Sequence, residues 1–187
     1  MLHPNEKRIL AIDLRSRSFG FAVFEGPTRL LDWGVRSFRQ GTNAVKIPAS
    51  LKFAGLMDEF SPSAIVFRKR DVGTKKRVEM HSALLGEAEK RRIPIRLLFP
   101  RAVKTSFPGC NRNKYTIATA LAEQLPELAS RLPDKRKIWK SEDYRMGIFD
   151  AAAVGVAYFG RQKPSHGVAV LAGAEETKGK DFAINYP

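Results

Sequence analysis

The chain has 187 residues, 43% of them hydrophobic, and it carries 33 Lys and Arg against 19 Asp and Glu, for a net charge of +14. This length and hydrophobic share allow one good core and exclude two large lobes. The basic excess is atypical of a small-molecule enzyme and indicates a polyanionic partner, most simply nucleic acid, although a merely solvated basic surface would have the same composition.

Three strands are predicted at the start of the chain, over residues 7–14, 18–25 and 29–38, as an antiparallel meander. Apolar residues at helical spacing predict a helix over residues 50–60, and Ser61-Pro62-Ser63 stops it. A fourth strand, Ala64-Ile65-Val66-Phe67, follows at once.

A second helix is predicted from about Lys76 to Arg92, followed by a fifth strand over residues 94–99. The side chains expected to face inward from this helix are Val78, Leu84, Leu85 and Ala88. Strand, helix and strand in this order imply a right-handed parallel crossover.

Two more helices are predicted in the last third of the chain. The first follows Asn113 as its N-cap. The second starts near Glu142, is apolar nearly all round and ends at Gly160, so it should pack against the sheet. We therefore expect one domain over residues 1–160 and a C-terminal tail over residues 161–187.

Cysteine content and the lengths of apolar stretches indicate the cellular compartment. The single cysteine, Cys110, excludes an internal disulfide and a cysteine-based zinc site. No apolar stretch approaches the roughly 18 residues that span a bilayer, and the first residues lack the apolar core of a signal peptide. These features predict a cytoplasmic protein.

Asp13 is the most informative residue, because it is a lone carboxylate in a strand that otherwise reads as buried. A buried charge is costly unless a metal, a substrate or an ion pair compensates it. A metal or a substrate is one interpretation, and pairing with Arg15 or Arg17 is the other. Asp150, near the start of the last helix, is either a second site residue or an ordinary acid favoured by the helix dipole.

Basic residues gather after the fourth strand, where residues 68–96 hold ten Lys or Arg and four acids. A cation can contact phosphate or can simply be solvated. The candidate nucleic-acid-binding residues are Arg15, Arg68, Lys69, Arg70, Lys75, Lys76, Arg77, Lys104 and Lys114.

The order of these elements resembles the ribonuclease H-like α/β fold, with a mixed five-stranded sheet flanked by helices. Within that fold, most of residues 7–159 resembles the RuvC-type Holliday-junction resolvases. The resemblance rests on Ile9-Leu10-Ala11-Ile12-Asp13 with Gly20 after it, Asp32-Trp33-Gly34, Pro62 to Phe67, Arg101-Ala102-Val103-Lys104 leading to Gly109 and Lys114, and Phe149-Asp150-Ala151-Ala152-Ala153.

The resemblance implies Mg2+- or Mn2+-dependent hydrolysis of phosphodiesters in branched DNA, as in recombination and repair. Asp13 and Asp150 would be the catalytic metal ligands, and Lys104 and Lys114 would lie beside the substrate backbone. A homodimer would match the symmetry of a four-way junction.

The chain departs from the family pattern at two acidic positions, where it has Arg68 and Gly147. Asp71 would complete the site if its side chain reached the two aspartates. Three other acids, Glu79, Glu87 and Asp143, lie close in sequence to elements that match the family pattern. Alternatively, Arg68 pairs with Asp13 in place of metal. The sequence therefore leaves two functions open: an impaired nuclease, or an inactive domain that binds structured DNA or RNA without cleavage.

Overall fold

The computed structural model describes residues 8–37, 48–69, 74–110 and 113–162, and these ranges contain a five-stranded sheet in the order β3-β2-β1-β4-β5. The strands are β1 (Arg8–Leu14), β2 (Ser18–Glu25), β3 (Arg29–Ser37), β4 (Ala64–Arg68) and β5 (Ile95–Leu98). The first three form the predicted antiparallel meander, and β4 and β5 run parallel to β1. The expected mixed sheet is confirmed.

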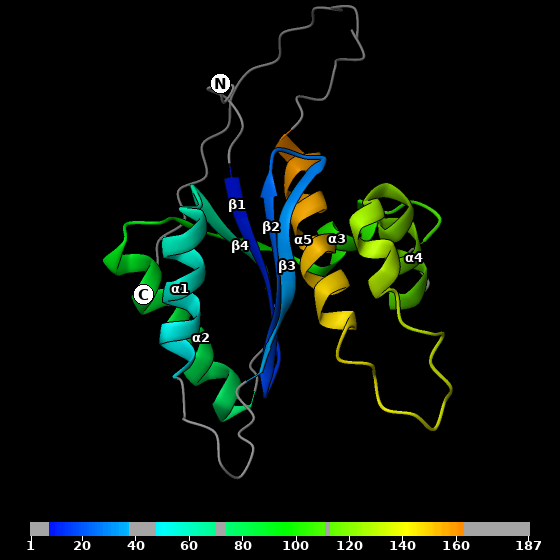
Figure 1. Ribbon diagram of the computed structural model, residues 1–187, viewed down its shortest axis with the longest axis horizontal. Coiled ribbons are helices and arrows are strands. Elements are labelled where there is room, and N and C mark those ends of the chain that lie inside the picture. The colour runs from blue at the N-terminus through cyan, green and yellow to red at the C-terminus, as the bar shows by residue number, and fades with distance from the viewer. Residues whose placement is uncertain (1–7, 38–47, 70–73, 111–112, 163–187) are drawn as a thin grey trace, which may run out of the picture.

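Helices cover both faces of the sheet (Figure 1). One layer is formed by α1 (Ala49–Phe60) and α2 (Lys75–Lys90). The other contains α3 (Pro100–Thr105), α4 (Lys114–Gln124), the 3-10 turn η1 (Pro126–Arg131) and α5 (Met146–Gln162).

The central strand β1 is buried on both faces, which explains its nearly unbroken apolar sequence. Successive side chains of a strand point to opposite sides of the sheet. Leu10 and Ile12 pack toward α1 and α2, whereas Ile9 and Ala11 pack toward α5. Asp13 continues the second series, so the backbone itself directs its carboxylate toward α5.

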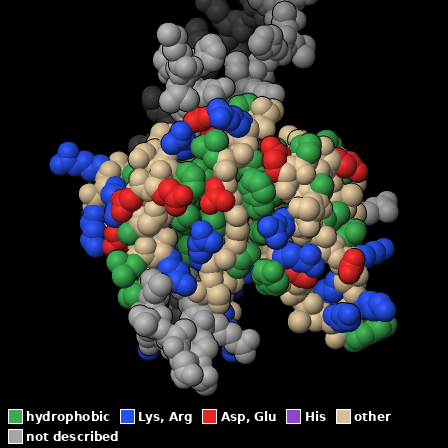
Figure 2. All heavy atoms as spheres, in the orientation of Figure 1, with side chains coloured by type: hydrophobic (Ala, Val, Ile, Leu, Met, Phe, Trp, Pro, Cys, Tyr) green, Lys and Arg blue, Asp and Glu red, His purple; other side chains and the backbone are tan. Residues whose placement is uncertain are grey.

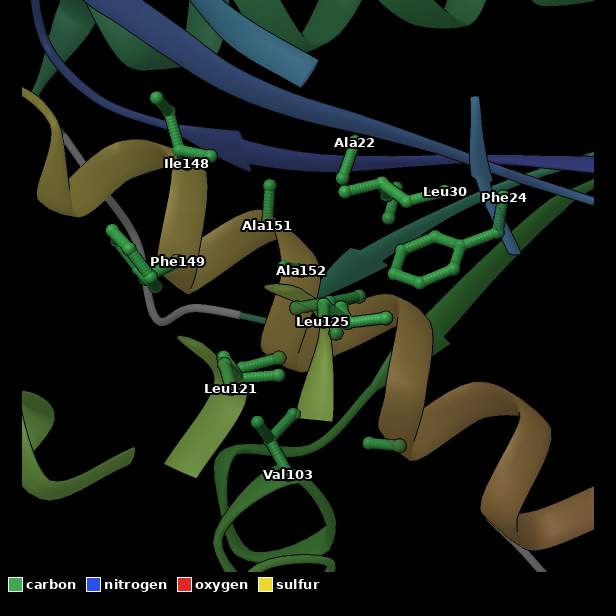
Figure 3. Close-up of a cluster of buried hydrophobic side chains, with 14 of the residues drawn as sticks. Ala22, Phe24, Leu30, Val103, Leu121, Leu125, Ile148, Phe149, Ala151 and Ala152 are labelled. Atoms are coloured by element: carbon green, nitrogen blue, oxygen red, sulfur yellow. The ribbon is translucent and has the colours of Figure 1, made fainter. Parts of the chain in front are cut away.

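Two glycines set how closely α5 lies on the sheet. A β-carbon on Gly20 would stand 2.0 Å from the carbonyl oxygen of Gly147, and one on Gly155 would stand 2.2 Å from Cε2 of Phe24. Figure 3 shows Phe24 in the layer between the sheet and α5. The absence of side chains at these glycines therefore allows the beginning and middle of α5 to approach β2.

The structure corrects several predicted boundaries. Helix α5 begins at Met146, because residues before it form a turn, and it continues past Gly160 to Gln162. Gly160 is exposed and costs an α-helix only about 1 kcal/mol, which is too little to end it. The short helix α3 and the turn η1 were not predicted.

The inward face of α2 also differs from the prediction. Leu84 and Ala88 are buried as expected, but Val78 and Leu85 are exposed, and Met80 takes the third buried place. The spacing of Met80, Leu84 and Ala88 is one residue every helical turn, so they share one face.

No helix in the described part of the chain is long and apolar enough to span a bilayer. Most of the predicted tail lies outside the described residues, so the boundary at residue 160 stays a prediction.

Candidate functional site

Asp13 and Asp150 lie on either side of one guanidinium group. Asp13 is at the end of β1 and is 1% exposed, and Asp150 is in the second turn of α5 and is 8% exposed. Arg15 Nε donates to Asp13 Oδ2 at 2.9 Å, and Arg15 Nη2 donates to Asp150 Oδ2 at 2.8 Å. The two aspartates therefore converge, and the cation between them comes from the chain.

Three further charged side chains complete this arrangement. Arg15 Nη1 lies 3.0 Å from Glu142 Oε2, and Lys114 Nζ lies 2.8 Å from Asp150 Oδ2 and 3.0 Å from Glu142 Oε1. Arg68 Nη2 approaches Asp13 Oδ1 at 3.5 Å. We call the following six side chains the ion-pair cluster: Asp13, Arg15, Arg68, Lys114, Glu142 and Asp150.

Arg15 remains charged in this setting. Burial alone would lower the pKa of its guanidinium, but the Asp13 charge and hydrogen bond, together with the charges of Asp150 and Glu142, raise the pKa above its ordinary value. Its position follows from the strand: Arg15 is two residues after Asp13 and so lies on the same side. Opposite it, Gly147 has no side chain, and a β-carbon there would lie 3.4 Å from Arg15 Nε.

The residues present do not fit the Mg2+ or Mn2+ site that the resemblance implies. Magnesium requires several oxygen ligands in a nearly octahedral arrangement. Both oxygens of Asp13 and Oδ2 of Asp150 instead lie beside protein cations. The ion-pair cluster has three carboxylates and three cations, so its formal charge is zero, and the described residues contain no group of acids, His or Cys suited to a metal.

A hollow of about 240 Å3 opens beside the ion-pair cluster. Arg68, Lys104 and Lys114 line it together with Asp150, and Phe149 forms part of its apolar wall. Lys104 makes no ion pair with another residue of the described ranges and is exposed, so it is free to contact a phosphate.

The remaining predicted cations are more dispersed. Lys69 is exposed, and its ammonium lies 4.9 Å from the centre of the Phe99 ring. Lys75 is exposed at the start of α2, and Arg77 is partly buried. Three candidates cannot be placed: Arg70, Asp71 and the side chain of Lys76 lie outside the described residues.

The acids considered as replacements do not join the ion-pair cluster. Asp143 pairs with Arg145, whose hydrogen bond lowers the pKa of the Asp143 carboxyl, and Glu87 pairs with Lys90 and Arg91 on α2. Glu79 is exposed on the same helix. The acid that does enter, Glu142, was missed, because it lies in a loop without periodicity.

Comparisons with known proteins identify the fold. No family model and no curated protein matches the sequence. Thermus thermophilus RuvC, solved with a Holliday junction substrate, aligns over 84% of this chain and 96% of its own, with a TM-score of 0.59 and 16% identity. The chain has the RuvC-type resolvase fold.

Other resolvases give similar alignments. The yeast mitochondrial Holliday junction resolvase Ydc2 covers 82% of this chain and 79% of its own, with a TM-score of 0.57 and 19% identity. The fowlpox virus resolvase, solved with Holliday junction DNA, covers 82% and 99%, with a TM-score of 0.52 and 13% identity. The expected ribonuclease H-like architecture is thus confirmed over most of the chain.

Proposed function

We propose that this protein binds branched DNA, such as a Holliday junction, and does not cut it. The observation that carries the proposal is the Arg15 guanidinium, which takes the place between Asp13 and Asp150 where the resemblance expects metal ions. The RuvC-type fold supplies the scaffold, and the basic residues beside the ion-pair cluster supply affinity for phosphate.

The loss of cleavage follows from charge and geometry. Two-metal hydrolysis requires carboxylates that hold cations and an activated water. In the ion-pair cluster the carboxylates are neutralised by Arg15, Arg68 and Lys114. A further cation would be repelled by these three groups and would have to displace hydrogen bonds made in a largely buried site.

Binding has separate requirements, because phosphate contacts need only cations at a suitable surface. The net charge of +14 supplies a general attraction, and Lys104, which is exposed in the hollow beside the ion-pair cluster and makes no ion pair within the described residues, supplies a local one. The solved resolvases of the same fold include structures with Holliday junction DNA, which supports a branched partner.

The test is incubation of the protein with a labelled four-way DNA junction and a linear duplex of the same length, with and without Mg2+ or Mn2+. We expect tighter binding to the junction, the same affinity with and without the metal, and intact strands after long incubation. Native gels measure the binding and denaturing gels measure the strand length.

The Asp13→Asn variant distinguishes the two functions. Metal-dependent nicks that disappear in this variant would show an active enzyme and contradict the proposal. Failure to bind any nucleic acid at low salt would reject both functions. Stronger binding to a structured RNA than to the junction would show that the preferred partner is RNA and not DNA.

A homodimer would suit a junction with twofold symmetry, because each subunit would face an equivalent strand exchange. Size-exclusion chromatography with light scattering, with and without the junction, measures whether two copies assemble.

A further inference from the structure

A turn before α5 carries two large apolar side chains at its tip. Lys140 N donates to Lys137 O at 3.0 Å, which closes the turn and places Ile138 and Trp139 at its two central positions. Central turn positions usually hold Gly, Pro, Asn, Asp or Ser. Here Ile138 is 93% exposed and Trp139 is 78% exposed, so neither side chain contributes appreciably to the core.

The residues around this tip are basic. We call residues 135–140 the basic turn, because Lys135, Arg136, Lys137 and Lys140 surround the two apolar residues and no acid lies among them. The Lys137 ammonium lies 5.7 Å from the centre of the Trp139 ring, and Arg136 Nε donates to Lys140 O at 2.6 Å. Figure 2 shows blue and green side chains together at the lower right, where Figure 1 places the loop before α5.

The basic turn is connected to the ion-pair cluster along the surface. A second hollow, of about 290 Å3, is lined by Lys135 and Arg136, and it shares Asn113 and Lys114 with the hollow that contains Lys104. Basic side chains thus follow a continuous path from the end of β4 to the basic turn. Two acids of the second hollow, Glu142 and Asp143, are already paired with Lys114 and Arg145, while Asp134 is exposed.

We propose that the basic turn reads unpaired bases in branched DNA: Trp139 stacks on a base that has left the duplex, and the surrounding cations hold the adjacent phosphates. This inference rests on the proposed function and adds a class of target to it. An aromatic ring among cations matches a nucleotide, because the base offers a flat apolar face and the phosphate offers charge. The tip has nothing else in the described chain to stack on.

The experiment compares duplexes that carry one unpaired nucleotide, either with its base or as an abasic residue of the same backbone charge. We expect the wild type to bind the duplex with the base about tenfold more tightly than the abasic duplex. This factor lies within the range typical of one stacked base. Trp139→Ala should lose this preference, and Trp139→Phe should retain much of it. Leu51→Ala, which truncates an apolar residue that is 61% exposed on α1, is the matched control and should leave the preference unchanged.

A second readout follows Trp139 itself. Trp33→Phe removes the other tryptophan of the chain, so the fluorescence of the variant comes from Trp139 alone. Stacking should quench this fluorescence with the unpaired base and leave it nearly unchanged with the abasic duplex. Lys135→Ala should weaken binding to both duplexes equally and lower the salt dependence, because it removes a phosphate contact but no stacking surface.

The outcomes separate the inference from the proposed function. If the protein binds the four-way junction but Trp139→Ala binds both duplexes as the wild type does, the inference is wrong and the function stands. If Trp139→Ala instead abolishes self-association or binding to anionic vesicles, the tip serves a second copy or a lipid surface and the inference is also wrong. If the wild type binds no DNA, the proposed function is wrong, and the inference that rests on it is wrong as well.

Discussion

Arg15 is the residue on which the chemistry of the site depends. Its guanidinium contacts Asp13, Asp150 and Glu142, which belong to a strand, a helix and a loop. Removing one partner of a buried ion pair is costly, because it leaves the other charge uncompensated.

Arg15→Met should therefore lower the free energy of unfolding by about 2–4 kcal/mol, somewhat below the value for a fully buried pair because the Arg15 side chain is 20% exposed. Urea denaturation measures the loss. Arg17→Met is the matched control, because Arg17 is exposed in the same turn and should change stability little. Equal stability of the two variants would contradict the central role of Arg15.

The composition of the ion-pair cluster also indicates which substitutions would create a metal site. The variant that combines Arg15→Gln, Arg68→Glu and Gly147→Asp removes two cations from the ion-pair cluster and adds two acids beside Asp13 and Asp150. Its melting temperature should rise with millimolar Mg2+ or Mn2+, whereas the wild type should not respond, because only a state that binds the ion is stabilised by it. A wild-type melting temperature that rises with either metal would contradict the poor fit of the native site.

At the scale of elements, glycine determines the fit of α5 on the sheet. Gly155→Ala would drive a β-carbon into the Phe24 ring and should cost about 1–3 kcal/mol, as overpacking does. Gly160→Ala on the same helix meets open space and should stabilise by about 0.5–1 kcal/mol, because alanine favours the helix. Thermal or urea unfolding measures the free energy of unfolding of each variant. A change in the same direction for both variants, relative to the wild type, would contradict the close packing at Gly155.

Helices α1 and α2 are joined by Arg91, whose guanidinium contacts Asp58 at 2.6 and 2.9 Å and Glu87 at 2.6 Å. The hydrogen bond from Arg91 lowers the pKa of Asp58, and those from Lys90 and Arg91 lower the pKa of Glu87, from ordinary values of 3.8 and 4.5. Carboxylates with a lowered folded-state pKa stabilise above the ordinary value and lose that contribution as the pH falls through the folded value.

Arg91→Met should therefore melt at a lower temperature than the wild type at pH 7, and the difference should shrink as the pH falls below the ordinary values of 3.8 and 4.5 and both acids become protonated. Thermal melts across this pH range measure it. Arg96→Met, on the exposed surface of β5, is the control and should show no such pH-dependent difference. A difference that stays constant with pH would rule out the ion pairs as its cause.

At the scale of the whole molecule, the net charge of +14 predicts DNA binding that weakens steeply with salt. Lys104→Ala should reduce the slope of log affinity against log salt by about 0.9, which corresponds to one phosphate contact. Arg161→Ala, at the opposite end of α5 from the ion-pair cluster, should change the slope much less. Equal slopes for the two variants would indicate that binding depends on total charge and not on the hollow beside the cluster.

Much of this architecture could be predicted from local patterns. The apolar run of β1 and the carboxylate within it indicated both the central strand and the candidate site, and the apolar helix around Asp150 indicated what packs beside it. The pairing of Asp13 with Arg15 or Arg68 was foreseen as an alternative, because Arg15 lies just after β1, the strand of Asp13 itself, and Arg68 is the last residue of the neighbouring strand β4.

Other features had no local signal. Helix α3 has six residues, which is too few to establish a period. Glu142 reaches Arg15 only through the three-dimensional path of its loop, and the arrangement of two hollows around Lys114 depends on how α4 lies against α5. Contacts between distant segments are set by packing, which a single sequence does not display.

The short spacing between Asp13 and Arg15 also affects the order of events in folding. These partners are two residues apart, whereas Arg15 and Asp150 are separated by 135. Closing a long loop costs more chain entropy than closing a short one, so the first pair is available before α5 arrives. Asp13 therefore finds a counter-ion within its own hairpin and does not depend on α5 to supply one.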